Sequence, residues 1–572
     1  MTATETHAPA TDEHAPATPE SLPSPGGLAG LLSSGDHKTL GRMWILASLL
    51  LGGFVLVCGL LLHIERANLP GLEVFAGIES FRQFFTLYRV GLIFLFVAPL
   101  WIGLATLVVP LQIGARGVAF PRAAAAAFWG WLTGAGILVA SWAIDGGLVG
   151  GGEQRAVELS LLSFAMVVLS LLAATAVLLT TMCTQRPAGM SLERMPLFSW
   201  SMLVAGGVWL LSLPVLVANL VIMWVDLRGP GAVRYGAGQN LYEQVSWVFD
   251  QPQVFVFAIP AIGVVGEILQ VAFGAPQQRR WGLMLSLVGL AGVFSFGADL
   301  QRFFSPTAQT TPLYVASGIV VALVVVALLG GWADLGRAAR RLPRPSGYLA
   351  VAMSALGVLV FAAIVGFIRV LGGAVGFLRS FARHNESWQS DLDRALAPLD
   401  DLRGTMAGAG LLDLVAMAAV LGAVAGLFYW SPKIFGRRAS HAAGFGVAAI
   451  VGAGGLLVGL MGLVAGFLGQ PERPSTHFAS SGAEAVAVLA VIGVIGVLLG
   501  LGVVVIVALR GATALARGAS TVPDPWGGHT MEWFATSPPP PDNFGAEPVV
   551  PVRSPHPLWD TPAADADEKG DS

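Results

Sequence analysis

Residues 247–269, WVFDQPQVFVFAIPAIGVVGEIL, decide the fold of this chain. In this stretch a polar step, Asp250-Gln251-Pro252-Gln253, precedes an apolar run. Pro252 is compatible with a helix start, because the first turn of a helix has no internal partner for the N–H that proline lacks. The stretch therefore predicts a helix that enters a membrane at its polar end.

Composition extends this prediction to the whole chain. The 572 residues are 55% hydrophobic and 12% charged, with a mean hydropathy of +0.71, which is too apolar for a soluble protein of this length. Roughly 20 apolar residues span the hydrocarbon core of a bilayer. Windows of this kind predict an all-α integral membrane protein with twelve transmembrane helices, at 43–64, 90–115, 123–144, 159–185, 195–225, 251–266, 281–298, 303–333, 345–368, 414–432, 439–471 and 485–509.

The cysteines and basic residues exclude other classes of protein. Cys58 and Cys183 both lie in apolar windows, which excludes a disulfide framework and a cysteine-based metal site. The 32 basic residues are spread thinly, and no basic patch carries interleaved aromatic residues. Nucleic-acid binding is therefore excluded, and the lipid bilayer is the expected environment.

The domain organisation follows from where apolar and polar segments alternate. Residues 1–36 predict a disordered N-terminal tail, 37–517 the membrane domain, and 518–572 a Pro-rich tail in water or on a neighbour's surface. Basic residues concentrate in alternate loops, so the positive-inside rule places both termini in the cytoplasm. The enlarged outer loop at 379–404 is either a docking surface for a partner or a solvated loop.

Five further segments carry a family resemblance, at 35–38, 109–122, 186–200, 427–433 and 524–533. Together these segments resemble cytochrome c oxidase subunit I of the haem-copper oxidase superfamily. In the opening stretch, Trp247, Phe249, Pro252 and Val254 match a motif in the sixth transmembrane helix of that family. The resemblance implies a twelve-helix subunit I-like bundle in a bacterial-type inner (plasma) membrane, and it names haem and copper as the cofactors of the family.

The same resemblance implies that the cofactor ligands are missing. The family holds two haems and one copper ion with six histidines, because imidazole ligates iron or copper while staying neutral. A tyrosine ligand for haem is chemically possible, so Tyr88 stays open between ligand and packing residue. The expected cofactor set is therefore empty, with the six positions occupied by Tyr88, Gly410 and Leu412 for haem and by Gln251, Ala291 and Gly292 for copper.

The resemblance also implies that the proton path is lost. The entry aspartate of the family falls on Gly117, its mid-path glutamate on Gln253 and its cross-linked tyrosine on Phe255. The arginine pair that holds the haem propionates falls on Glu472 and Arg473, which reverses one charge. No lysine of this chain lies inside a predicted helix, since the three are Lys38, Lys433 and Lys569.

Two intramembrane charges stand beside lost haem ligands. Arg89 and Asp413 each follow such a position by one residue, and an unpaired charge in a bilayer costs about 2.5–3.5 kcal/mol or more. We therefore expect an ion pair between them across the vacated pocket, the alternative being that each faces an interface. Because empty cavities destabilise a fold, bulky side chains are expected to fill the pockets, namely Trp209, Phe255, Phe294 and Phe361.

Three functions follow from these observations. The favoured one is a non-catalytic subunit I-like protein of the aerobic respiratory chain, a pseudoenzyme that serves a structural, assembly or regulatory role beside other oxidase subunits of type I, II or III. The second is an active terminal oxidase with displaced ligands, which oxidises cytochrome c, reduces oxygen and pumps protons. The third is a transporter or sensor in which Arg89, Asp413, Glu267 and Arg369 form a polar path.

Overall fold

The structure is a computed structural model of the whole chain. It describes residues 30, 34–148, 153–229, 241–295, 307–339, 342–382, 402, 404–472, 483–545 and 552–560. The chain divides into a short unit, Met1–Ser34, and a large unit, Gly35–Ser572. All helices described below belong to the large unit.

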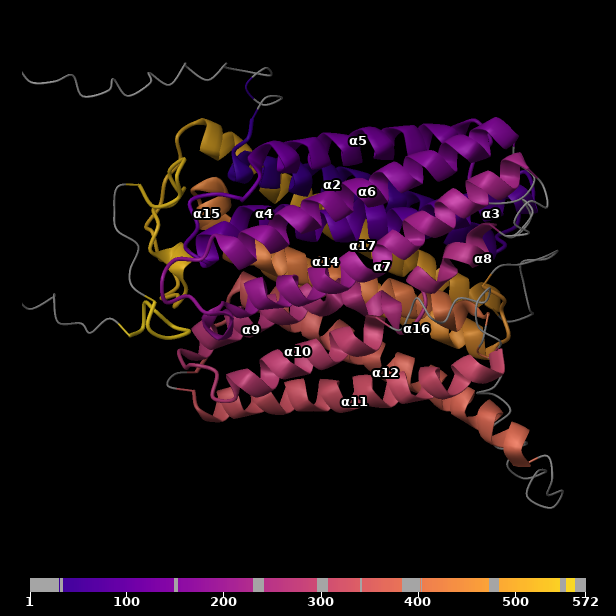
Figure 1. The fold of residues 1–572 in the computed structure, drawn as a ribbon. Coiled ribbons are helices and arrows are strands. Elements are labelled where there is room, and N and C mark those ends of the chain that lie inside the picture. Colours follow the sequence, from indigo (N-terminus) through magenta and orange to yellow (C-terminus); the bar gives the residue numbers. More distant parts are fainter. Residues whose placement is uncertain are drawn as a thin grey trace, which may run out of the picture. The chain divides into compact units, whose positions relative to one another are not determined.

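Long helices run side by side through the large unit (Figure 1). The main ones are α2 (His37–Arg66), α3 (Ile78–Gly91), η1 (Leu92–Val97), α4 (Ala98–Gln112), α5 (Pro121–Ala143), α6 (Gln154–Thr184), α7 (Leu197–Arg228), α9 (Ile259–Phe273), α10 (Arg280–Ser295), α11 (Thr307–Arg337), α12 (Gly347–Ala382), α14 (Met406–Tyr429), α16 (His441–Phe467) and α17 (Ala483–Ala516). Short helical segments connect them, namely η2 (Leu192–Arg194), α8 (Leu241–Val245), η3 (Ser246–Val248), η4 (Gln253–Ala258), α15 (Ser431–Phe435) and η6 (Met531–Trp533).

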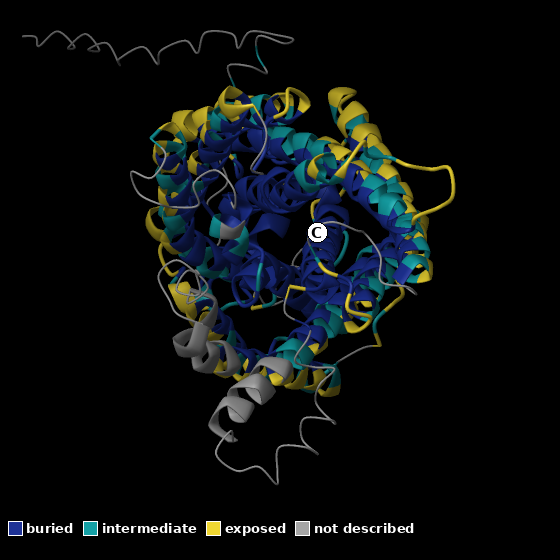
Figure 2. Ribbon diagram, turned by 90° about the vertical axis from the view of Figure 1, so that its right-hand side faces the viewer, coloured by how far each residue is buried: buried dark blue, intermediate teal, exposed yellow. Residues whose placement is uncertain are grey.

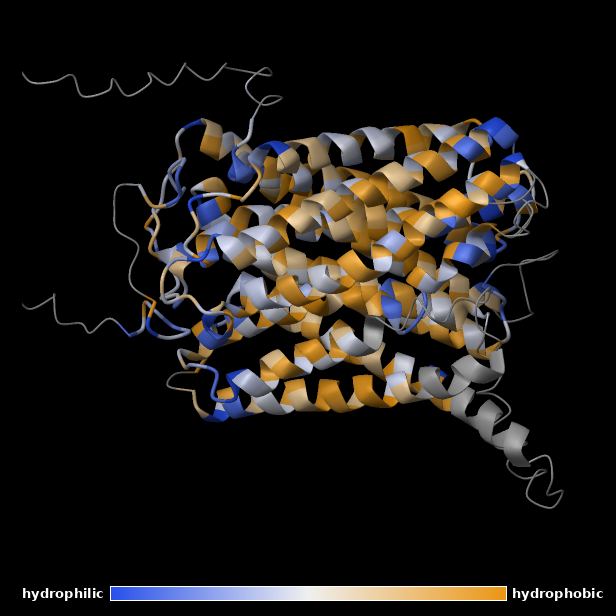
Figure 3. Ribbon diagram, in the orientation of Figure 1, coloured by the Kyte–Doolittle hydropathy of each residue, from blue (hydrophilic) through white to orange (hydrophobic). Residues whose placement is uncertain are grey.

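The predicted fold class is confirmed. Among the described residues, eleven helices are long and apolar enough to cross a membrane, and α10 is a shorter apolar helix. Each of the twelve predicted windows falls on one of these helices, with η1 joining α3 and α4 into one long segment. Apolar residues dominate the middle of the helices, and hydrophilic residues gather at both ends (Figure 3). The chain is therefore a multi-pass membrane protein.

The stretch at 247–269 differs in detail from the prediction. Two tight 3₁₀ turns, η3 and η4, come first, and the regular α-helix begins only at Ile259. Pro260, not Pro252, occupies the first turn of α9. The helix ends at Gly274, which adopts the left-handed conformation that glycine tolerates best (φ 61°).

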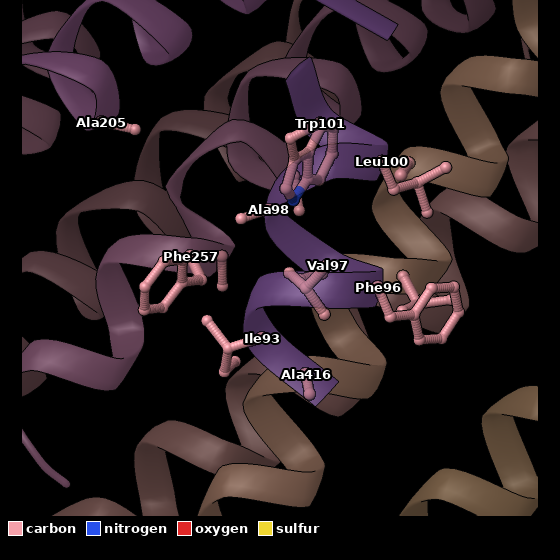
Figure 4. Packing of buried hydrophobic residues seen from close by; sticks show 14 of the residues in the cluster. Ile93, Phe96, Val97, Ala98, Leu100, Trp101, Ala205, Phe257 and Ala416 are labelled. Carbon is pink, nitrogen blue, oxygen red and sulfur yellow. The ribbon is translucent and has the colours of Figure 1, made fainter. Parts of the chain in front are cut away.

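The core of the bundle lies around α14, η1 and α9. Every residue of α14 is buried, and so is every residue of η1. A helix that is apolar on all sides belongs in the interior, and the many Ala and Gly residues of α14 let neighbouring helices approach closely. Figure 2 shows the buried residues at the centre of the ring of helices, and Figure 4 shows Ile93, Val97 and Phe257 packed in that core.

The segment after α17 packs against its own bundle, contrary to the prediction of a tail in water or on a neighbour. Asn543 accepts a hydrogen bond from Lys38 (3.1 Å) and lies 3.0 Å from a ring nitrogen of His37, and it donates one to the Ala115 carbonyl (2.7 Å). Trp533 is 2% exposed. We call the end of the bundle where residues 518–545 lie the tail end, and the end where α2 finishes at Arg66 the far end.

Two other predicted regions lie mainly outside the described residues. Nearly all of the tail 1–36 is outside them. Of the enlarged loop 379–404, the first four residues continue α12, and beyond those only Leu402 and Gly404 are described. The role of that loop stays a prediction.

Candidate functional site

The two positions on α14 that the resemblance assigns to haem histidines lie in a closed helix interface. A Cβ atom at Gly410 would stand 2.7 Å from the carbonyl oxygen of Gly459 and 3.1 Å from the Cα atom of Gly462, both on α16. Conversely, a Cβ atom at Gly462 would stand 2.7 Å from the Cα atom of Gly410. Leu412 is fully buried. The backbones of α14 and α16 are therefore in contact at this level.

Tyr88 on α3 faces the same region. Its ring packs on α2, where a Cβ atom at Gly59 would stand 2.6 Å from the ring carbon Cε2. Its hydroxyl donates a hydrogen bond of 2.7 Å to the carboxylate of Asp413 on α14. Tyr88 thus joins three helices, and its oxygen is already engaged by a carboxylate.

Arg89 has a different partner from the one predicted. Its guanidinium forms an ion pair with Glu472, in the segment after α16, while Asp413 accepts the hydrogen bond from Tyr88. The Arg89 side chain is 1% exposed and that of Glu472 is 17% exposed. Both Arg89 and Arg66 interact electrostatically with Asp413. Charge in this part of the bundle is therefore balanced by a group of residues and not by one pair.

These residues form what we call the arginine–carboxylate cluster, which comprises Arg66, Tyr88, Arg89, Asp413 and Glu472. Arg66 donates a hydrogen bond of 2.9 Å to the Glu472 carbonyl. The Glu472 backbone N–H donates to the carbonyl of Gly404 (2.9 Å), just before α14. The cluster ties α2, α3, α14 and the segment after α16 together at the far end.

Arg369 on α12 lies beside this cluster. A Cβ atom at Gly408 would stand 3.3 Å from both an Arg369 nitrogen and a Glu472 carboxylate oxygen. Of the four charged residues in the transporter or sensor hypothesis, Arg369, Arg89 and Asp413 therefore gather at the far end. The fourth, Glu267, does not lie with them.

Glu267 on α9 is held at the tail end. Its carboxylate accepts a hydrogen bond from the backbone N–H of Leu197 and lies 3.1 Å from a ring nitrogen of His529. The side chains of Glu267 and His529 are each 1% exposed. Glu267 thus anchors the segment after α17 and does not belong to a continuous path with Arg89 and Asp413.

The positions assigned to copper hold residues that pack or face outward. Gln251 is 5% exposed and donates a hydrogen bond of 3.2 Å to the carbonyl of Gly366 on α12. Ala291 is buried on α10, and Gly292 is exposed with no neighbour within 4 Å of its Cβ position. The only nitrogen or oxygen atoms that these three side chains supply are those of the Gln251 amide, because Ala291 and Gly292 carry none.

The positions of the proton path are likewise built into the packing. Gln253 donates a hydrogen bond of 3.0 Å to the hydroxyl of Ser212 on α7, and Phe255 is 4% exposed. Gly117 is half-buried in the connection between α4 and α5. None of these three side chains ionises.

A small apolar pocket adjoins Phe255 between α9, α10, α11 and α12. Leu290 and Trp332 also line it, whereas Tyr88 and Leu412 do not. Of the residues predicted to fill the pockets, Trp209 is 1% exposed and Phe255 lines this cavity, while Phe361 is half-buried. The side chain of Phe294 lies outside the described residues.

Two ionisable groups at the tail end have shifted pKa values. Burial raises the pKa of Glu532, and the carboxylate of Glu267 adds to that rise. Glu532 accepts hydrogen bonds from Gln112 (3.1 Å) and Trp430 (3.0 Å). Burial also lowers the pKa of the Lys433 ammonium to about 7, and this side chain donates to the carbonyls of Ala535 and Thr536. These contacts fasten the segment after α17 to α4, α14 and α15.

The described histidines lie at helix ends and in the segment after α17. His37 and His63 lie at opposite ends of α2, and His441 begins α16. His529 and His556 lie in the segment after α17, with their ring centroids 4.7 Å apart. No group of three or more His, Cys, Asp or Glu side chains that could hold a metal ion occurs within the described ranges.

Sequence reasoning missed two partners. It treated Glu472 only as a reversed charge, although a carboxylate at 472 could have been weighed as a partner for the intramembrane guanidinium of Arg89. It also missed the contact of Glu267 with His529, because nothing in the sequence joins positions so far apart.

Comparisons with known proteins agree on one family. The family model described as cytochrome c and quinol oxidase polypeptide I matches residues 39–390. A probable cytochrome c oxidase subunit 1-beta of Nocardia farcinica is 27% identical, with 93% of this chain and 87% of that protein covered. A putative cytochrome c oxidase subunit 1-beta of Streptomyces coelicolor is 29% identical, with 91% and 88% covered.

Two further comparisons concern a longer protein and a solved structure. The heme-copper oxidase subunit I+III of Aeropyrum pernix is 26% identical, and the match covers 91% of this chain but only 62% of that protein. A heme-copper terminal oxidase dimer solved by cryo-electron microscopy shares the fold, with a TM-score of 0.63 and 13% identity over 83% of this chain and 84% of that chain.

Proposed function

This chain belongs to the cytochrome c and quinol oxidase polypeptide I family, and we propose that within this family it is a non-catalytic member. In this proposal it has lost the ligands of haem a, haem a3 and CuB together with the proton-path residues. It keeps the bundle of a subunit I and serves as a structural, assembly or regulatory subunit of a respiratory complex.

The contact between α14 and α16 carries the proposal. A histidine at position 410 would need its Cβ atom 2.7 Å from a backbone oxygen of α16. Real Cβ atoms do not approach backbone oxygen this closely, so an imidazole there requires the two helices to separate.

The chemistry of the remaining positions supports the same proposal. Leu412, Ala291 and Gly292 offer no donor atom, and the amide of Gln251 is a weak ligand for iron or copper compared with imidazole. The hydroxyl of Tyr88 is engaged by Asp413 at 2.7 Å. These residues do not fit a bis-imidazole haem or a three-histidine copper site, so no reaction step is assigned to either group.

Partners follow from the family. Subunit I proteins of this kind are named as parts of oxidases, and one relative is named as a fusion of subunits I and III. We propose oxidase subunits of type I, II or III as partners, in a bacterial-type inner membrane with both termini in the cytoplasm. Purification of the full chain in mild detergent, followed by mass spectrometry of associated chains, would identify them.

The test of the proposal is a reduced-minus-oxidised visible spectrum of the purified full chain, with iron and copper quantified on the same sample. A catalytically active haem-copper oxidase purified in the same way serves as positive control. We expect no haem bands and less than one tenth of an equivalent of each metal per chain. One or two haems per chain would refute the proposal and support an active oxidase with displaced ligands.

The substitution Tyr88→Phe tests whether the chain binds haem through Tyr88. If haem were present through Tyr88, the substitution Tyr88→Phe would remove or shift its absorption bands. Under our proposal this variant has the same featureless spectrum as the parent chain, and only its stability changes.

A further inference from the structure

A hollow at the tail end has the features of a lipid site. It lies between the connection from α15 to α16 and the end of α17. Three arginines line it, namely Arg437, Arg438 and Arg510. Its lining contains no acidic side chain. The positive charge of the hollow is therefore not neutralised by its own walls.

The three arginines are accessible to a ligand that approaches from outside the bundle. Arg437, Arg438 and Arg510 are all exposed. Arg438 stacks over the ring of Trp526, with its guanidinium carbon 5.4 Å from the ring centroid, which fixes that side chain beside the hollow. A guanidinium presents N–H groups in a fork that fits the oxygens of a phosphate.

The other wall of the hollow is apolar and continues toward the bilayer. Val503, Ile506 and Val507 of α17 line the hollow. The outer face of α17 continues with Leu499, which is 63% exposed, and Ile506 itself is 51% exposed. Because these side chains lie in a membrane-spanning helix, this face meets lipid chains.

The order of these groups along α17 matches the order of groups in a phospholipid. Apolar side chains come first, and Arg510 follows Ile506 by about one helical turn, near the end of the helix. Basic pockets between transmembrane helices at the membrane surface bind anionic lipid head groups. We propose that this hollow binds one anionic phospholipid, with its phosphate at Arg437, Arg438 and Arg510 and an acyl chain along Val503 and Ile506.

This inference does not depend on whether the chain holds haem. A bound lipid would clamp α16 to α17 at the tail end, next to the packed segment that contains Trp526. It assigns the chain a specific lipid ligand in addition to the general contact with a bilayer.

Native mass spectrometry of the full chain tests the proposal. The chain is released from micelles that contain equimolar phosphatidylglycerol and phosphatidylcholine. We expect one phosphatidylglycerol to stay bound to the parent chain, and at least a ten-fold loss of its affinity in the double variant Arg437→Gln/Arg510→Gln. The matched control is Arg116→Gln/Arg122→Gln, which should keep the lipid. It removes one exposed charge in the connection between α4 and α5 and one in the first turn of α5.

Other outcomes would overturn the proposal. Equal retention of phosphatidylcholine, or equal loss of phosphatidylglycerol in the control variant, would show that binding is not specific to these arginines. If inorganic phosphate at the same concentration displaced the lipid completely, the ligand would be a free phosphate. The melting temperature of each variant in detergent is measured alongside, so that a loss of binding is scored only for a folded chain.

Discussion

Removing the guanidinium of Arg89 should destabilise the bundle far more than removing the half-buried Arg82 on the same helix. In Arg89→Met the carboxylate of Glu472 loses its ion-pair partner, although it is 17% exposed and keeps some contact with solvent. Breaking a buried ion pair by removing one partner costs about 3–5 kcal/mol. The guanidinium also lies 5.1 Å from the ring centroid of Phe85, a contact that contributes about 1 kcal/mol.

We therefore expect Arg89→Met to lower the free energy of unfolding by about 3–5 kcal/mol. Glu472→Gln should cost a similar amount, because it leaves the 1% exposed guanidinium of Arg89 without its main counter-charge. The double variant should cost clearly less than the sum, by at least about 2 kcal/mol, since neither charge is then left alone.

The assay is unfolding of the purified chain in mixed detergent micelles, followed by circular dichroism at several denaturant fractions. The matched control is Arg82→Met on the same helix, whose partner Glu79 lies 3.0 Å away and is 54% exposed. This partly exposed pair should contribute about 0–1 kcal/mol. Additive effects of Arg89→Met and Glu472→Gln, within about 0.5 kcal/mol, would refute the cluster as the element that balances these charges.

Three further predictions use the same assay. Tyr88→Phe removes the hydroxyl that donates a hydrogen bond to the buried Asp413 and should cost about 1–3 kcal/mol, and no loss would show that Asp413 is satisfied without it. Gly410→Ala should cost about 1–3 kcal/mol through overpacking, whereas Gly446→Ala, whose Cβ position has no neighbour within 4 Å, should be neutral or stabilising. For Lys433 the folded pKa is about 7 and the ordinary value is 10.5, so the unfolded chain binds more protons between these values and stability should rise with pH there. Lys433→Met should flatten this rise of stability with pH, and an unchanged slope would refute the assignment of the rise to Lys433.

The helices themselves were predictable from the sequence, because the length of an apolar window is a local property. The start of α9 was not, since the chain makes two tight turns before it becomes regular at Ile259. Pro252 and Pro260 both suit the first turn of a helix. The choice between them depends on how the residues around Gln251 pack against α12, which no local pattern encodes.

The contact of Arg89 with Glu472 was not predicted, for a similar reason. The sequence offered a carboxylate on a helix expected to face α3, and that carboxylate does lie in the same cluster. The segment after α16 returns across the start of α14, however, where the backbone N–H of Met406 donates to the carbonyl of Gln470 (3.0 Å). This return places Glu472 against Arg89. Neither hydropathy nor residue spacing predicts that the segment after α16 passes across the start of α14.

The packing of the segment after α17 could not be predicted from its composition. Its run of prolines indicates an extended chain, whereas the described backbone there contains bends, turns and the short helix η6. Composition does not say which surface an extended chain covers. Trp533 and Glu532 are buried there, and their partners Tyr429, Gln112 and Trp430 lie more than a hundred residues earlier.

The glycine contact between α14 and α16 has a consequence for evolution if the proposed function holds. A substitution that places a histidine at position 410 would bring its Cβ atom against the backbone of Gly459. Such a substitution would first have to separate the two helices, so a ligand at this position could not return by one replacement alone. Under the proposal, the contact would act as an evolutionary ratchet.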